Sequence, residues 1–129
     1  MPVADTSFIV DLMRKDPGAL ECYQEYEEQG IALFTTGITA LELYKGAFVS
    51  GSDDNRIKVQ KILELFVVIP IDDPVYETFG RLAAGLCRKG NPVGDFDEVI
   101  AAITLLADKK IITRDRHFEK IPNISLITY

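Results

Sequence analysis

The residues of this sequence best suited to chemistry are acids that lie far apart along the chain. They are Asp5, Glu42, Asp95, Asp97 and Asp115, in the segments VADTS, TALELYKGA, NPVGDFDEVIAA and IITRDRHF. Carboxylate oxygens are hard ligands that suit Mg²⁺ or Mn²⁺ better than zinc. If the acids converge, they repel one another unless they are protonated or bind cations. A converging set therefore predicts a divalent-metal site, which with two ions can hold both oxygens of a phosphodiester displacement.

The order of short strands and amphipathic helices indicates how these acids are brought together. The pattern predicts strands over 2–5, 31–35, 66–69, 110–113 and 125–128, and helices over 8–14, 17–29, 36–49, 53–63, 72–89 and 95–109. Helical crossovers are typical of parallel strands. We therefore predict an α/β fold with three layers, α/β/α, and a central parallel sheet of four to five strands flanked by helices. In such a sheet the functional crevice lies outside the carboxyl ends of the strands.

Each acid also has a purely structural interpretation. Asp5 could cap the helix that follows it, and Asp115 could cap a short turn ending at Phe118. Asp95 and Glu98 form a D-x-x-E capping box. Asp53 is expected to cap the helix over 53–63. Only the joint placement of the acids after strands favours a metal site over a set of helix caps.

Four segments, in order and with similar spacing, resemble one known family. They are VADTSFIV, LELYKGA, GNPVGDFDEVIAA and IITRDRHFEKIPNISLI, which together cover nearly the whole chain. The chain resembles the PIN-domain family, and specifically the ribonuclease toxins of VapBC toxin–antitoxin pairs. By this resemblance Asp5, Glu42, Asp97 and Asp115 correspond to the metal-site acids of the family, and Asp95 is an auxiliary ligand or a cap.

The resemblance implies further properties of the site and its partners. The hydroxyls of Thr6, Ser7 and Thr113 lie beside ligands, where members of the family often place hydrogen bonds to the carboxylates or to bound water. The resemblance also implies an RNA substrate such as transfer or ribosomal RNA, a homodimer, and a VapB-like antitoxin that covers the site. Arg114 and Arg116 flank Asp115, and they could steer a phosphate or be ordinary solvated charges.

Composition sets the broad class of the protein. The 129 residues carry a net charge of −6, which argues against binding nucleic acid by basic residues alone but not against a metal-dependent nuclease. One domain, residues 1–129, is expected. Two distant cysteines and a single histidine make a zinc site improbable. The start MPVADTSFIVDLMRKD lacks the features of a secretory signal, so we expect a cytoplasmic protein.

These observations favour a divalent-metal-dependent endoribonuclease. Water activated by Mg²⁺ or Mn²⁺ attacks the phosphorus in line and expels the 3′ oxygen, leaving 5′-phosphate and 3′-hydroxyl ends. Two alternatives remain. One is a ribosomal-RNA-processing nuclease of the same fold. The other is a non-catalytic interaction module whose acids bind a basic partner segment.

Overall fold

The protein is built around one parallel sheet. The structure is a computed structural model, and it describes all 129 residues. The strands are β1 (Val3–Ala4), β2 (Phe34–Thr36), β3 (Val67–Ile69), β4 (Lys110–Ile112) and β5 (Ser125–Ile127). They form a five-stranded sheet in the order β3-β2-β1-β4-β5, in which every neighbouring pair is parallel. This order reverses direction beside β1, so the topological switch point lies between β1 and β4.

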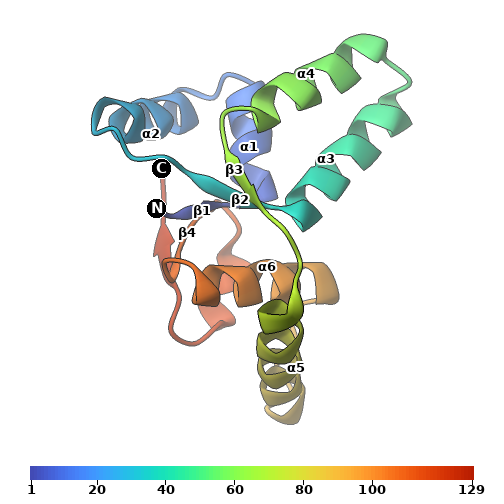
Figure 1. The fold of residues 1–129 in the computed structure, drawn as a ribbon, viewed down its shortest axis with the longest axis vertical. Coiled ribbons are helices and arrows are strands. Elements are labelled where there is room, and N and C mark those ends of the chain that lie inside the picture. Colours follow the sequence, from blue (N-terminus) through green and yellow to red (C-terminus); the bar gives the residue numbers. More distant parts are fainter.

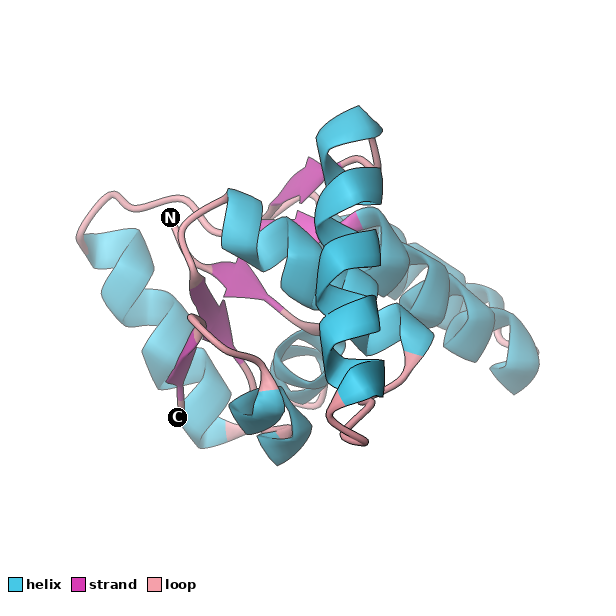
Figure 2. Ribbon diagram, turned by 90° about the horizontal axis from the view of Figure 1, so that it is seen from below, coloured by secondary structure: helices cyan, strands magenta, loops and turns pink.

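Helices connect these strands and cover both faces of the sheet. They are α1 (Thr6–Met13), α2 (Pro17–Glu28), α3 (Gly37–Ser50), α4 (Asp53–Leu63), α5 (Asp73–Arg88) and α6 (Asp95–Leu106), with a short 3₁₀ helix, η1 (Arg116–Lys120). Helices α1 to α4 lie on one side of the sheet, and α5 and α6 lie on the other (Figure 1). The view turned by 90° shows the strands enclosed between helices (Figure 2). The predicted three-layer α/β/α class is confirmed.

Every predicted strand and helix is present, but several boundaries differ. The strand predicted over 31–35 begins only at Phe34, whose N–H donates to the carbonyl of Pro2. The residues before it close the preceding helix, because the N–H of Ile31 bonds back to Tyr26. The helix predicted over 95–109 ends at Leu106, because Lys109 turns into the left-handed region at φ 57°. No helix combines the length and apolar character that a membrane span requires.

Side-chain caps fix the starts of the helices near the sheet. The Asp5 carboxylate accepts from the N–H of Phe8 at the start of α1, and the Thr36 hydroxyl accepts from the N–H of Thr39 at the start of α3. The predicted cap of α4 at Asp53 is wrong. Ser52 provides it, since its hydroxyl accepts from the N–H of Asn55 at 3.3 Å and Asp53 is already helical.

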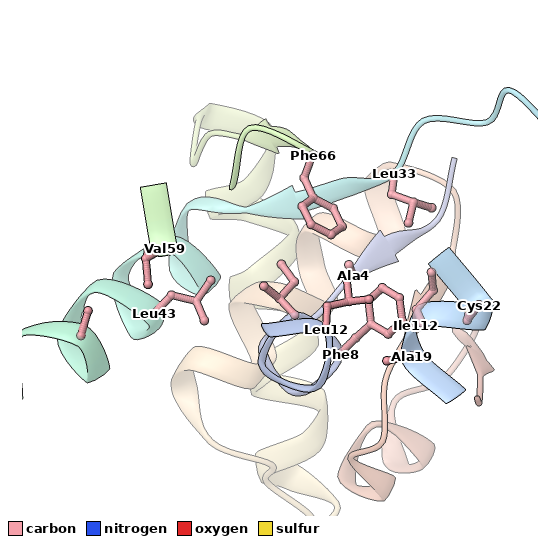
Figure 3. Packing of buried hydrophobic residues seen from close by; sticks show 12 residues of the cluster. Ala4, Phe8, Leu12, Ala19, Cys22, Leu33, Leu43, Val59, Phe66 and Ile112 are labelled. Carbon is pink, nitrogen blue, oxygen red and sulfur yellow. The ribbon is translucent and has the colours of Figure 1, made fainter. Parts of the chain in front are cut away.

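Two hydrophobic clusters lie on the two faces of the sheet. Because strand residues alternate in direction, Ile112 points into the cluster beneath α1 to α4 and Ile111 into the cluster beneath α5 and α6. Figure 3 shows the first cluster, where Phe8 and Leu12 of α1 pack against Ala4 and Ile112. The second cluster includes Phe118 of η1. Helix α1 is thereby held against the strand that leads directly into its first residues.

The helices differ greatly in how much they bury. In α6, every residue from Ile100 to Thr104 is buried, whereas Val59 is the single buried residue of α4. The α6 backbone therefore forms part of the core, while α4 lies on the surface of its layer.

We expect Phe8→Ala to destabilise the protein by about 3–5 kcal/mol, because it removes a fully buried ring and leaves a cavity. Urea unfolding followed by circular dichroism measures this free energy. Phe48→Ala is the matched control, since that residue is 61% exposed and its ring lies 5.1 Å from the guanidinium carbon of Arg56. We expect Phe48→Ala to lower the free energy of unfolding by less than about 1 kcal/mol. Equal losses for the two variants would contradict the described packing.

Candidate active site

The carboxylate of Asp5 lies buried at the switch point, directly after β1. Its Oδ1 accepts hydrogen bonds from the Ser7 hydroxyl at 2.7 Å and from the N–H of Phe8 at 3.1 Å. Its Oδ2 accepts from the Thr113 hydroxyl at 2.6 Å, at the end of the neighbouring strand β4. Burial nevertheless raises the pKa of Asp5, outweighing the hydrogen bonds that lower it, and the charge of Asp115 raises it slightly further. Asp5 is therefore rigidly oriented, and its negative charge is incompletely compensated.

A second carboxylate, Glu42 of α3, faces the start of α1. The hydroxyl of Thr6 donates to its Oε1 at 2.7 Å and is also 3.2 Å from the hydroxyl of Thr39. Thr39 is fully buried one turn before Glu42 on the same helix. The predicted proximity of the Thr6, Ser7 and Thr113 hydroxyls to acids is thus observed as three short hydrogen bonds. Thr39 was not predicted, because no feature of the sequence distinguishes it from other helical threonines.

The pKa of Asp97 indicates that Asp5, Glu42, Asp97 and Asp115 share one electrostatic environment. Burial and the negative charges of Asp115, Glu42 and Asp5, in that order of importance, raise the pKa of Asp97 to about 6, while His117 lowers it. These groups come from α6, the segment after β4, α3 and the end of β1. Four acids that are far apart in sequence therefore lie within electrostatic reach of one another.

Asp115 combines the capping role predicted for it with a position beside the other acids. Its Oδ1 accepts from the N–H of His117 at 2.9 Å and starts η1, as the structural interpretation expected. The same oxygen is 2.9 Å from Nδ1 of His117, whose side chain is 65% exposed. The N–H of Asp115 donates to the Thr113 hydroxyl that also bonds Asp5. Thr113 thus links two of the acids through one hydroxyl group.

The predicted capping box of Asp95 and Glu98 is wrong. Helix α6 is preceded by Gly94, and its start carries no side-chain cap. The buried Glu98 carboxylate instead accepts from the N–H groups of Val93 and Gly94, at 3.1 and 2.9 Å. This contact holds the turn in which Gly94 adopts φ 124°, a conformation that favours glycine. Asp95 is exposed and is not among the charges that raise the pKa of Asp97, so its auxiliary role stays a prediction without structural support.

The two arginines beside Asp115 are held differently. Nε of Arg114 lies 3.2 Å from the buried Asp11, which also accepts a hydrogen bond from Tyr129. Arg116 is 86% exposed and pairs with Glu119. Sequence reasoning missed Asp11 and Tyr129; the one available signal was a charged residue within the apolar helix segment SFIVDLM.

The donor chemistry of the site fits a hard divalent cation, although the acids are not drawn together. As the side chains stand, no three His, Cys, Asp or Glu residues form a group that could hold a metal ion. Two clefts flank the acids: one of about 300 Å³ between α1, α3 and α4 beside Glu42, and one of about 460 Å³ beside Asp115 and Arg114.

Comparisons with known proteins agree on one family. Residues 3–124 match the model of the PIN domain. The chain is 32% identical over 93 residues to the tRNA(fMet)-specific endonuclease VapC of Salmonella typhimurium, covering 70% of each protein. It is 28% identical over 122 residues to ribonuclease VapC1 of Haemophilus influenzae, covering 93% of this chain and 91% of the relative.

Solved structures give the same result for the fold. The chain is similar to DNA-bound VapBC from Salmonella typhimurium, with a TM-score of 0.86, 25% identity, and coverage of 99% of this chain and 98% of that one. It is also similar to VapBC-1 from nontypeable Haemophilus influenzae, with a TM-score of 0.78, 27% identity, and coverage of 98% and 96%.

The raised pKa of Asp97 predicts how the metal-free protein responds to pH. A carboxyl whose folded pKa exceeds its unfolded value of about 4 favours folding at low pH, and this contribution is lost as pH rises through about 6. We therefore expect Asp97→Asn to gain thermal stability over the wild type as pH rises from about 4 to about 7, because the amide never ionises. Melting curves in EDTA measure this difference.

The control for this measurement is Glu64→Gln. Glu64 is an exposed acid between α4 and the edge strand β3. Its substitution by Gln removes the same negative charge far from the site. A pH-independent difference between the wild type and Asp97→Asn would show that folding does not raise the pKa of Asp97.

Proposed function

This chain belongs to the PIN-domain family and is of the VapC type, and on that premise we propose that it is a divalent-metal-dependent endoribonuclease, the toxin of a toxin–antitoxin pair. The observation that carries the proposal is the approach of acids from separate segments to one place. Thr113 bonds both Asp5 and the N–H of Asp115, Thr6 beside Asp5 bonds Glu42, and the charges of these three acids add to burial in raising the pKa of Asp97. A cluster of this kind is costly unless cations or protons compensate it.

The residues proposed to hold Mg²⁺ or Mn²⁺ are Asp5, Glu42, Asp97 and Asp115. When bound, a divalent cation lowers the pKa of water and offsets the charge that develops on a phosphate undergoing in-line displacement. A carboxylate has about four acceptor positions, and Asp5 uses three of them for hydrogen bonds, which leaves about one for a cation. With three hydrogen bonds, Asp5 is thus the most firmly oriented of the four proposed ligands.

The hydroxyl groups of the chain orient the carboxylates of the proposed ligands. Thr113 and Ser7 hold the Asp5 carboxylate from the β4 side and from α1, and Thr6 holds Glu42. Metal ligands that are fixed in this way keep their geometry when substrate binds. The proposed displacement leaves 5′-phosphate and 3′-hydroxyl ends. Arg114 and Arg116 are proposed to contact the RNA backbone beside the cleaved bond.

We propose the substrate and the partners from the similarity of this chain to known proteins. One relative bears the name of a tRNA(fMet)-specific endonuclease, which supports structured RNA, either transfer or ribosomal, as substrate. The similar solved structures are complexes of the VapBC type, which supports a VapB-like antitoxin as partner. The cleft beside Glu42 contains the apolar residues Val10, Leu43 and Val59, and we propose that an antitoxin segment covers the site there. A homodimer is part of the same proposal.

We expect each of the variants Asp5→Ala, Glu42→Ala, Asp97→Ala and Asp115→Ala to lose cleavage by more than about 100-fold, because loss of groups that merely orient ligands already costs about 10–100-fold. The assay is Mn²⁺-stimulated digestion of total RNA by the purified chain freed of its partner, with mapping of the cleaved ends. Glu64→Ala is the control and should cleave like the wild type. Retained cleavage by the Asp5 and Asp97 variants would refute the site, and ends carrying 3′-phosphate would refute the chemistry.

A second measurement separates the nuclease from an interaction module that uses its acids to bind a basic segment. Mg²⁺ or Mn²⁺ should raise the melting temperature of the wild type saturably, since a ligand that binds only the folded state stabilises it by about 2.7 kcal/mol at 100 times its Kd. Asp5→Asn should abolish the increase, and Glu64→Gln should retain it. A wild-type melting temperature that does not respond to either ion would favour the interaction module.

A further inference from the structure

A buried acid outside the acid cluster connects two distant parts of the chain. Asp11 of α1 is only 6% exposed. Its Oδ2 accepts a hydrogen bond from the Tyr129 hydroxyl at 2.6 Å and lies 3.2 Å from Nε of Arg114. A buried carboxylate persists only where charged or hydrogen-bonding partners compensate it. Asp11 therefore requires both partners, and both come from the segments that follow β4.

Tyr129 is itself fixed in place. Its ring meets that of Phe8 edge-on, with centroids 5.0 Å apart and planes at 68°. A Cβ atom on Gly18 would lie 3.3 Å from the carbonyl carbon of Tyr129, so this residue also packs closely against α2. Burial, followed by the hydrogen bond to Asp11, raises the pKa of Tyr129, so that the phenol keeps its proton and donates it.

Arg114 is consequently held at both its backbone and its side chain. Its N–H donates to the Ser7 hydroxyl, which in turn donates to Asp5. Its side chain pairs with Asp11 through Nε and remains 59% exposed. A guanidinium group has five N–H donors in a rigid plane, so pairing through Nε leaves further donors for a ligand. The plane is oriented before any ligand arrives.

The open side of Arg114 faces the cleft of about 460 Å³ that runs beside Asp115. Thr113, Asp115 and Tyr129 also line this cleft. Arg116 shares it, but its partner Glu119 lies on the same short 3₁₀ helix and both side chains are largely exposed. The pair of Arg116 is therefore a surface ion pair of small energetic value, whereas Arg114 is anchored to a buried acid.

We propose that Arg114 contacts an RNA phosphate next to the cleaved bond, and that Asp11 and Tyr129 are positioning residues that hold its guanidinium group in the cleft for this contact. The inference rests on the proposed ribonuclease function and extends it to two residues outside the acid cluster. Pre-orientation reduces the side-chain entropy that binding must remove, and it favours bidentate contact with phosphate.

The test measures kcat and KM on a short fluorescent RNA over a range of salt concentrations. Arg114→Ala should raise KM about tenfold with a smaller change in kcat, because a charged hydrogen bond to bound substrate is lost. The slope of log(kcat/KM) against log salt should become shallower by about 0.7, as expected for one phosphate contact with a single strand. Tyr129→Phe and Asp11→Asn should change KM and slope in the same direction by less.

The decisive comparison is the double-mutant cycle. Tyr129→Phe should have no further effect on KM in the Arg114→Ala background, because it acts only through that arginine. Additive effects, or a lower kcat with unchanged KM and salt slope, would overturn the positioning role and leave a structural one. Arg81→Ala is the matched control: it breaks the exposed pair with Glu77 on α5, and its KM should equal that of the wild type. Tyr129→Phe removes one oxygen atom, so it tests the proposal even if Asp11→Asn does not fold.

A binding arm separates this proposal from the proposed function. The same RNA is titrated into the Asp97→Asn protein, with and without Arg114→Ala and Tyr129→Phe, and followed by fluorescence anisotropy. If the wild type does not cleave but the Arg114 and Tyr129 variants bind more weakly, the nuclease assignment fails and the positioning role stands. Cleavage by the wild type with equal affinities of all variants overturns the positioning role alone. Absence of RNA binding by every protein overturns both.

Discussion

The negative charge of Asp5 is buried, and the arrangement of the site follows from the need to keep it there. Its carboxylate is the first side chain after β1, so it lies at the switch point and also caps α1. Ser7 and Thr113 approach it from two elements that are distant in sequence, which ties the start of the chain to the end of β4. Burial still outweighs these hydrogen bonds and raises the pKa of Asp5. The residual charge is available for a cation.

The other acids add further negative charge that the protein does not compensate. Asp97 lies at the start of α6, where the helix dipole alone would favour its charge, yet burial and its acidic neighbours raise its pKa to about 6. Concentrating like charges in one place lowers the stability of the empty protein and increases the affinity for cations. This also reconciles a net charge of −6 with the proposed RNA substrate, because the proposed cation, rather than a basic surface, would compensate the phosphate.

Much of this architecture was predictable from the sequence, since alternating strands and helices imply a parallel sheet and acids after strands converge at one edge. The bounds of α4 matched the prediction, and so did the fold class and the family. The start of β2 was missed, because the apolar run from Ile31 reads as strand although pairing with the chain before β1 begins only at Phe34. The contact between Asp11 and Tyr129 spans 118 positions and depends on how β5 ends beside α1, which no local pattern encodes.

Because α6 is much more buried than α4, the two helices are expected to differ in how easily they open. Amide hydrogens in α6, where Ile100 to Thr104 are all buried, are expected to exchange with solvent only at a free energy near that of global unfolding. Helix α4, which packs through the buried Val59 and the partly buried Ile62 and Leu63, is expected to open locally at a lower free energy than α6. It forms one wall of the cleft beside Glu42. Helix α6, which carries Asp97, lies on the other side of the sheet from this cleft (Figure 1), so local opening of α4 is expected to leave Asp97 in place.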